Sequence, residues 1–152
     1  MKRGLYALGF IIVFGSISGV LSKYWDTLPA PPRSHKIQLD GTKSNDADHI
    51  LAVLMRVEFN AAKSKESLSS SNETFYSSDA DPNEIAAFYR KALDVPWSVA
   101  GDTESKGGRL IVYRKMMSGE MKVIIIEKRL RRDAKNQITP DGGSIIGTTD
   151  LK

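Results

Sequence analysis

Three acidic residues near the middle of the sequence are of a type that can bind a metal ion. Asp79, Asp81 and Glu84 lie close together, and carboxylate oxygens are the ligands that hard divalent cations prefer in proteins. The same spacing is typical of a helix start, because Pro82 directly follows Asp81 and Glu84 comes three residues after it. The free amides and the dipole at a helix N-terminus favour acids there without a metal. Capping therefore explains these acids, and the sequence predicts no metal or cofactor.

The two histidines are the remaining side chains that could serve as general bases. His49 follows Asp48, a carboxylate that could orient its imidazole, whereas His35 lies in a proline-containing stretch. No serine lies in a Gly-x-Ser-x-Gly pattern, the chain has no cysteine, and neither Gly-Gly pair is followed by the lysine of a phosphate-binding loop. Because no nucleophile is placed opposite either histidine, the sequence predicts that the chain is not an enzyme.

A run of basic residues after the most apolar strand-like segment is the candidate binding site. It could contact anionic lipid headgroups, cell-wall polymers or an acidic envelope protein, and the formal net charge of +4 agrees with such a surface. A solvated strand end and loop would have the same composition. The candidate contact residues are Lys128, Arg129, Arg131, Arg132 and Lys135.

The N-terminal segment predicts on which side of a membrane such a site would act. Lys2 and Arg3 precede residues 4–22, which carry no charge and would form a helix roughly 28 Å long, about the thickness of a bilayer's hydrocarbon core. The positive-inside bias keeps the N-terminus in the cytoplasm and sends the remainder across a bacterial-type inner membrane. The alternatives are a cleaved signal peptide, which leaves a secreted or periplasmic protein, and a core helix of a cytosolic protein. The predicted location excludes nucleic acid as a partner.

The next two segments predict a spacer and then a helix. Residues 23–44 contain three closely spaced prolines, which favour an extended polyproline conformation. From residue 45 to 63, apolar residues recur at helical spacing with Asn45 or Asp46 as the N-cap, although alternation as far as Phe59 also allows a strand. We favour the helix, whose predicted apolar stripe consists of Ile50, Val53, Leu54, Val57 and Ala61.

A second helix is predicted over residues 81–94. It begins at the Asp81 cap, and Pro96 ends it because a proline disfavours helical geometry in the residue before it. Its single apolar stripe consists of Ile85, Phe88, Tyr89, Ala92 and Leu93.

Four strands are predicted around this helix. Residues 74–77, 97–99, 109–114 and 121–128 are rich in β-branched and aromatic residues, and Gly119 forms the hairpin turn between the last two. Residues 121–128 have apolar side chains on both faces, which is typical of a central strand. The predicted fold class is therefore α+β: a helix packed on an antiparallel β-sheet, with a β-α-β-β-β core and a preceding helix.

These elements divide the chain into four predicted parts. Residues 1–22 form a transmembrane anchor or signal segment, and residues 23–44 form a Pro-containing spacer. Residues 45–132 form an extracytoplasmic α+β domain, and residues 133–152 form a flexible tail.

Part of this pattern resembles small uncharacterised bacterial envelope proteins and lipoproteins. The resemblance covers residues 73–127 and depends on residues 75–82 (FYSSDADP), the Phe88-Tyr89 pair in the helix, and Trp97. In that group an extended segment ending in Ser/Thr-Asp precedes a helix and a β-meander, so the resemblance implies the same α+β fold. This chain has Pro96 where that group usually has glycine, and it lacks the cysteine that would carry a lipid.

These observations lead to one expected function and one alternative. We expect a membrane-anchored, extracytoplasmic interaction or accessory domain without catalytic activity. The alternative is a small ligand-binding or hydrolytic envelope domain with a pocket between helix and sheet. An apolar pocket larger than about 300 Å³ with convergent polar groups would favour a ligand. An exposed apolar patch or a bare sheet edge would favour a partner protein.

Overall fold

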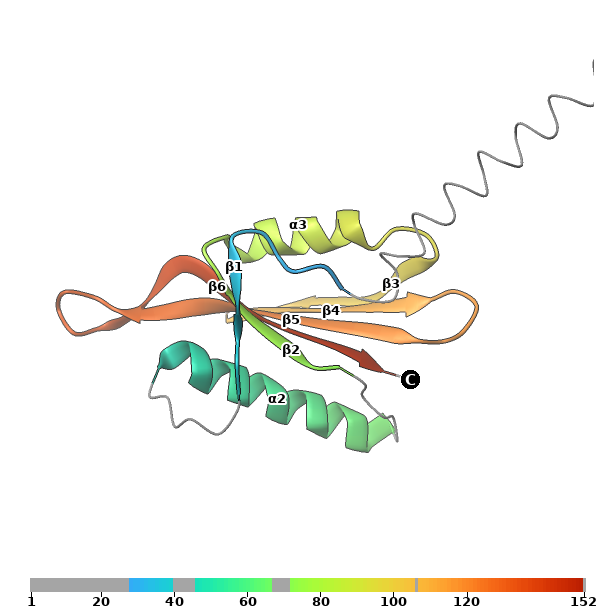
Figure 1. Ribbon diagram of the computed structural model, residues 1–152, viewed down its shortest axis with the longest axis horizontal. Helices are drawn as coiled ribbons and strands as arrows, with labels where there is room; N and C mark the ends of the chain where they lie inside the picture. The colour runs from blue at the N-terminus through green and yellow to red at the C-terminus, as the bar shows by residue number, and fades with distance from the viewer. Residues whose placement is uncertain (1–27, 40–45, 67–71, 106, 152) are drawn as a thin grey trace, which may run out of the picture.

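The computed structural model describes residues 28–39, 46–66, 72–105 and 107–151, which form one antiparallel sheet with a helix on each face (Figure 1). The spatial order of the strands is β1-β2-β6-β5-β4-β3. The predicted α+β class is confirmed. The elements along the chain are β1 (Ser34–Ile37), α2 (Ala47–Glu66), β2 (Thr74–Ser78), α3 (Pro82–Ala92), β3 (Trp97–Glu104), β4 (Gly108–Lys115), β5 (Met121–Arg132) and β6 (Ile138–Leu151).

Strand β5 has apolar side chains on both faces and lies inside the sheet, between β6 and β4. Ile124 and Ile126 pack into the core under α3, whereas Val123 and Ile125 pack into the core under α2. Its predicted position as a central strand is therefore confirmed. Burying both faces of this strand requires a cover on each side of the sheet, which the two helices supply.

Helix α3 forms as its sequence predicts. The Asp81 side chain accepts hydrogen bonds from the backbone N–H groups of Asn83, at 2.8 Å, and Glu84, at 3.2 Å. These bonds satisfy amides that have no partner within the helix. Ile85 and Tyr89 are buried against the sheet, as the predicted stripe requires.

Helix α2 is confirmed as a helix, but its predicted apolar stripe is not the face that packs on the sheet. Its buried apolar side chains are Ala52, Met55 and Phe59, which pack against β5 and β6. The helix is apolar on two opposite sides, so periodicity alone could not decide which side faces the sheet. The predicted stripe faces outward instead, with exposed fractions of 52% for Ile50, 41% for Val53, 54% for Leu54 and 59% for Val57.

The predicted flexible tail over residues 133–152 is also wrong. Ile138–Leu151 form β6, which pairs with β2 on one side and β5 on the other. Ile145 and Ile146 are fully buried, and each contributes to a different core. Three glycines surround this short apolar segment, and glycine is depleted in strands, which hides its strand character in the sequence.

The predicted spacer over residues 23–44 is wrong for the part that the structure describes. Residues 34–37 form edge strand β1, which pairs with β2. The Ser78 hydroxyl donates a 2.6 Å hydrogen bond to the Pro32 carbonyl, and Leu28 packs against the core under α3. The described residues 28–39 therefore belong to the folded domain.

The predicted membrane anchor lies within residues 1–22, outside the described residues. In the described part of the chain, neither helix combines the length and the apolar character that a membrane span needs.

Gly147 allows α2 to approach the sheet closely. A Cβ atom at this position would lie 3.1 Å from both the Met55 Sδ and the Phe59 Cε2 atoms. We expect Gly147→Ala to lower the free energy of unfolding by roughly 1–3 kcal/mol, because the added methyl group overpacks a filled interface.

Gly101→Ala is the matched control, because its Cβ would meet only the Val112 Cβ, at 3.9 Å. Chemical denaturation of both variants provides the comparison. Equal losses of stability would contradict the proposed role of Gly147.

Candidate functional site

A groove lies on the α2 side of the sheet, where the helix leaves part of the sheet uncovered. Helix α2 packs on β1, β2, β5 and β6, while β3 and β4 extend beyond it. The groove has a volume of about 580 Å³, within the range of small-molecule sites. Its lining residues are Glu58, Phe59, Thr103, Ser105, Gly108, Arg109, Leu110, Val112, Arg114, Met121, Val123, Ile125, Glu127 and Leu151.

The floor of the groove is apolar because alternate residues of β4 and β5 point to the same face. Leu110 lies opposite Ile125, and Val112 lies opposite Val123. Phe59 of α2 forms part of the wall, and Leu110 remains 40% exposed. An apolar molecule that settled on this floor would remove hydrocarbon surface from water, which favours binding.

One end of the groove is acidic. Glu127 of β5 pairs with Gly108 of β4, and its side chain lies over that glycine. A Cβ atom on Gly108 would come within 2.6 Å of the Glu127 Cδ and 2.2 Å of the Ile126 carbonyl oxygen. The glycine therefore provides the space that the carboxylate occupies.

At this acidic end, the Glu127 carboxylate lies near a second carboxylate, that of Glu58. Burial raises the pKa of Glu127, and the negative charge of Glu58 on α2 raises it further. Within the described part of the chain, no cation or hydrogen-bond donor contacts the Glu127 carboxylate. The groove thus combines an apolar floor with an acidic end for which the described residues supply no counter-charge.

The predicted basic run does not form one cationic surface. Arg129 forms ion pairs of 2.8 Å with both Asp79 and Asp141, and its side chain is only 13% exposed. Arg131 binds Asp48 with both terminal nitrogens, one of them at 2.8 Å. Two of the five cationic side chains therefore form ion pairs within the folded domain.

The other three basic residues lie along the β5–β6 hairpin, two of them in β5 and one in the connecting turn. Lys128, Arg132 and Lys135 are exposed, and Arg132 donates a 2.8 Å hydrogen bond to the Asn136 side chain. Figure 1 shows this hairpin projecting past the ends of both helices. Contact with an anionic surface stays a prediction for these three side chains.

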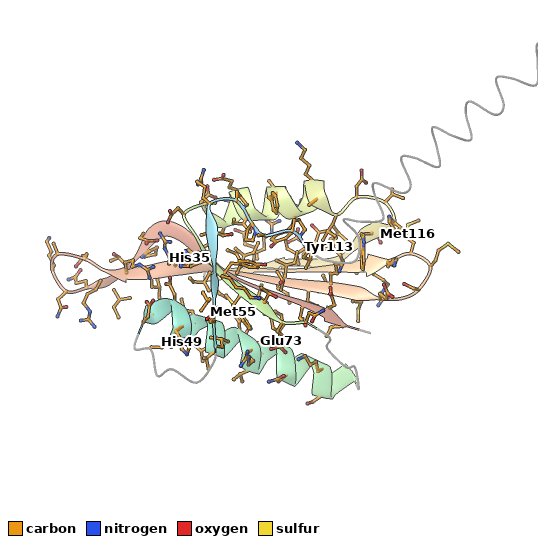
Figure 2. All side chains as sticks on the ribbon, in the orientation of Figure 1. His35, His49, Met55, Glu73, Tyr113 and Met116 are labelled. Carbon is orange, nitrogen blue, oxygen red and sulfur yellow. The ribbon has the colours of Figure 1, made fainter. Side chains whose placement is uncertain are left out.

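The acids considered as metal ligands have separate roles. Asp79 pairs with Arg129, Asp81 caps α3, and Glu84 pairs with Arg33 at 2.6 Å. No group of three potential metal-binding side chains occurs among the residues that the structure describes. Figure 2 shows His35 on edge strand β1 and His49 near the start of α2.

Sequence reasoning found neither the groove nor the buried acid that orients α2. Asp48 accepts a 2.7 Å hydrogen bond from the Ser77 hydroxyl in addition to its bonds from Arg131. Burial raises the pKa of Asp48, but the hydrogen bonds from Arg131 and Ser77 outweigh it and leave the pKa below 3.8. The one sequence signal for the groove is Glu127, an acid within an apolar strand.

We expect Asp48→Asn to lower the free energy of unfolding by roughly 3 kcal/mol at neutral pH, because it removes the bidentate ion pair between the buried Asp48 carboxylate and Arg131. The folded-state pKa of Asp48 lies below its ordinary value, so its contribution is present above about pH 4 and is lost as the pH falls further. Chemical denaturation of wild type and variant across this range measures the loss.

Glu84→Gln is the matched control, because it makes the same carboxylate-to-amide change in the exposed pair with Arg33. Exposed ion pairs contribute about 0–1 kcal/mol. A difference between Asp48→Asn and wild type that persists unchanged at pH 2 would show that the carboxylate charge is not the cause.

Comparison with known proteins finds no matching family model, no matching curated protein and no matching solved structure. The resemblance of residues 73–127 to bacterial envelope proteins stays a prediction.

Proposed function

We propose that the folded domain is a non-catalytic interaction module that residues 4–22 hold on the outer side of a bacterial-type inner membrane. Its partner is a membrane protein that packs an apolar helix against the outward side of α2. The observation that carries this proposal is the exposed stripe of α2, defined as Ile50, Val53, Leu54 and Val57, all more than 40% exposed.

The spacing of the exposed stripe suits a helical partner. Its residues occupy positions i, i+3, i+4 and i+7, which form one continuous ridge on a helix. Contiguous apolar surface of this kind is disfavoured in water and is typical of interaction sites. The stripe lies opposite Ala52 and Met55, so a partner can cover it without disturbing the core.

The size of the exposed stripe favours a partner held in the same membrane. Four side chains present on the order of a few hundred Å², whereas a stable interface between free proteins needs about 800 Å² from each side. A shared membrane raises the effective concentration of the partner and offsets the small contact area. A dimer held only by two copies of this stripe would lack sufficient area.

The predicted anchor would keep the domain close to the membrane. Only residues 23–27 lie between the predicted span and Leu28, which packs in the core under α3. Five residues reach at most about 18 Å when fully extended. This short connection supports a partner whose contact surface lies near the bilayer.

The first experiment tests the location of the domain. The chain has no cysteine, and Met117 on the β4–β5 hairpin is 96% exposed, so Met117→Cys adds a single reactive thiol. We expect a maleimide that cannot cross the inner membrane to label this variant in intact cells.

A cysteine inserted directly after Met1 is the control, and it should react only after the cells are lysed. Labelling of Met117→Cys only after lysis would place the domain in the cytoplasm and would contradict the proposed location.

The second experiment tests the partner contact on the full chain in its membrane. A photoreactive amino acid at Leu54 should crosslink to an integral membrane protein, and the same group at Met117 should not. Val57→Gln should reduce the Leu54 crosslink at least tenfold, while stability changes by less than about 0.5 kcal/mol because the residue is exposed.

Three outcomes would contradict the proposed contact. These are a crosslink only to a second copy of this chain, a crosslink only to lipid, or equal crosslinking from positions 54 and 117. The stability measurement on Val57→Gln separates loss of the contact from loss of the fold.

A further inference from the structure

We propose that the groove between α2 and strands β3–β5 binds an organic cation whose hydrocarbon body lies on the apolar floor and whose ammonium group pairs with Glu127 and Glu58. This site is distinct from the exposed stripe of α2, and the proposal goes beyond the partner contact. Its support comes from the shape of the groove, the pairing of the other acids, and the position of the groove's cations.

The first support is the division of the groove into an apolar part and an acidic part. Leu110, Val112 and Ile125 form a continuous hydrocarbon surface, and Glu127 closes one end of it. A volume of about 580 Å³ is ample for a compact hydrocarbon ring with an amine. A ligand with both parts would use the whole groove.

The second support is that the other mostly buried acids of the described residues have cationic partners. Their side chains are 5–22% exposed, and each lies within ion-pair distance of an arginine or lysine. The pairs are Asp48 with Arg131, Glu73 with Lys63, Asp102 with Arg109, Asp141 with Arg129, and Asp150 with Lys122.

Glu127 differs from all of these acids. It is half-buried, and the charge of a described residue that shifts its pKa is that of another carboxylate, Glu58. Two acids near each other at the end of an apolar groove create a negative potential that a cation would neutralise. A bound ammonium group would supply the counter-charge that the described residues do not.

The third support is the position of the positive charges in the groove. The Arg109 side chain already binds Asp102, with nitrogen–oxygen distances of 2.7 and 2.8 Å. Arg114 is exposed and lies at the opposite end, where its partner across the ladder is Met121. The end of the groove at Glu127 therefore favours a ligand with a cationic group. Binding of an anion at Arg114 is the alternative that the experiment below tests.

The ionised Glu127 carboxylate lowers the stability of the free protein. Because burial and Glu58 raise the pKa of Glu127 above 4.5, ionisation costs stability as the pH rises through and above that value. Glu127→Gln should therefore unfold at a higher denaturant concentration than wild type at pH 7, with no difference below about pH 4. We therefore expect this variant to keep its fold, which makes it suitable for binding measurements.

Three compounds of nearly the same shape test the proposal on the full chain in phosphatidylcholine nanodiscs. They are cyclohexylmethylamine, cyclohexylmethanol and cyclohexanecarboxylate, which are respectively cationic, neutral and anionic at pH 7. Titration calorimetry measures affinity, and methyl NMR of Leu110 and Val112 reports the place of binding. We expect the amine to bind about tenfold more tightly than the alcohol, a difference of about 1.4 kcal/mol, and the carboxylate to bind most weakly.

The variants assign this preference to the acidic end. Glu127→Gln should remove the tenfold preference for the amine and leave the affinity for the alcohol unchanged. Glu104→Gln is the matched control, because Glu104 pairs with Arg109 across the ladder and is not among the groove residues. It should leave the affinity for both compounds unchanged.

Several results would overturn the proposal. These are tightest binding of the carboxylate, equal affinity for amine and alcohol, equal effects of the two glutamine variants, absence of methyl shifts at Leu110 and Val112, or no binding at millimolar concentration. None of these results bears on the crosslink from the outward side of α2, so the two proposals can fail separately.

Discussion

The two apolar faces of β5 determine the layered structure of the domain. Both faces must be removed from water, so one helix cannot complete the core. Adjacent strands lie about 4.8 Å apart, so six strands span roughly 24 Å, whereas a helix with its side chains is about 10 Å wide. On the α3 side, residues 28–33 add further cover, and Leu28 joins the core there. On the other side, α2 packs on β1, β2, β5 and β6, which leaves the groove over β3–β5.

The features that local sequence predicts are those whose physical cause lies within a few residues. Helix α3 begins with its own cap, carries one apolar stripe and ends before Pro96. Strand β5 has enough β-branched residues to identify both its conformation and its central position. For these elements, the conformation that the local sequence prefers is also the one that tertiary packing requires.

The features that the sequence did not predict depend on residues far apart along the chain. Asp48 and Arg131 are 83 positions apart, and their ion pair helps to turn α2 so that the predicted stripe faces outward. Strand β6 gains its order from two neighbouring strands and not from its own composition. The groove likewise exists only after α2, β3, β4 and β5 come together, so the importance of Glu127 could not be judged from its neighbours in sequence.

The strand order also constrains how a newly made chain can fold. Strands β1 and β2 join the β3–β5 meander only through β6, the last of these elements to be synthesised. A nascent polypeptide that has reached Arg132 therefore has two incomplete sheet fragments with open edges. Such edges are prone to pair with other chains, and distant strand pairing is slow. The short interval before β6 docks is thus the stage at which a chaperone would most effectively prevent aggregation.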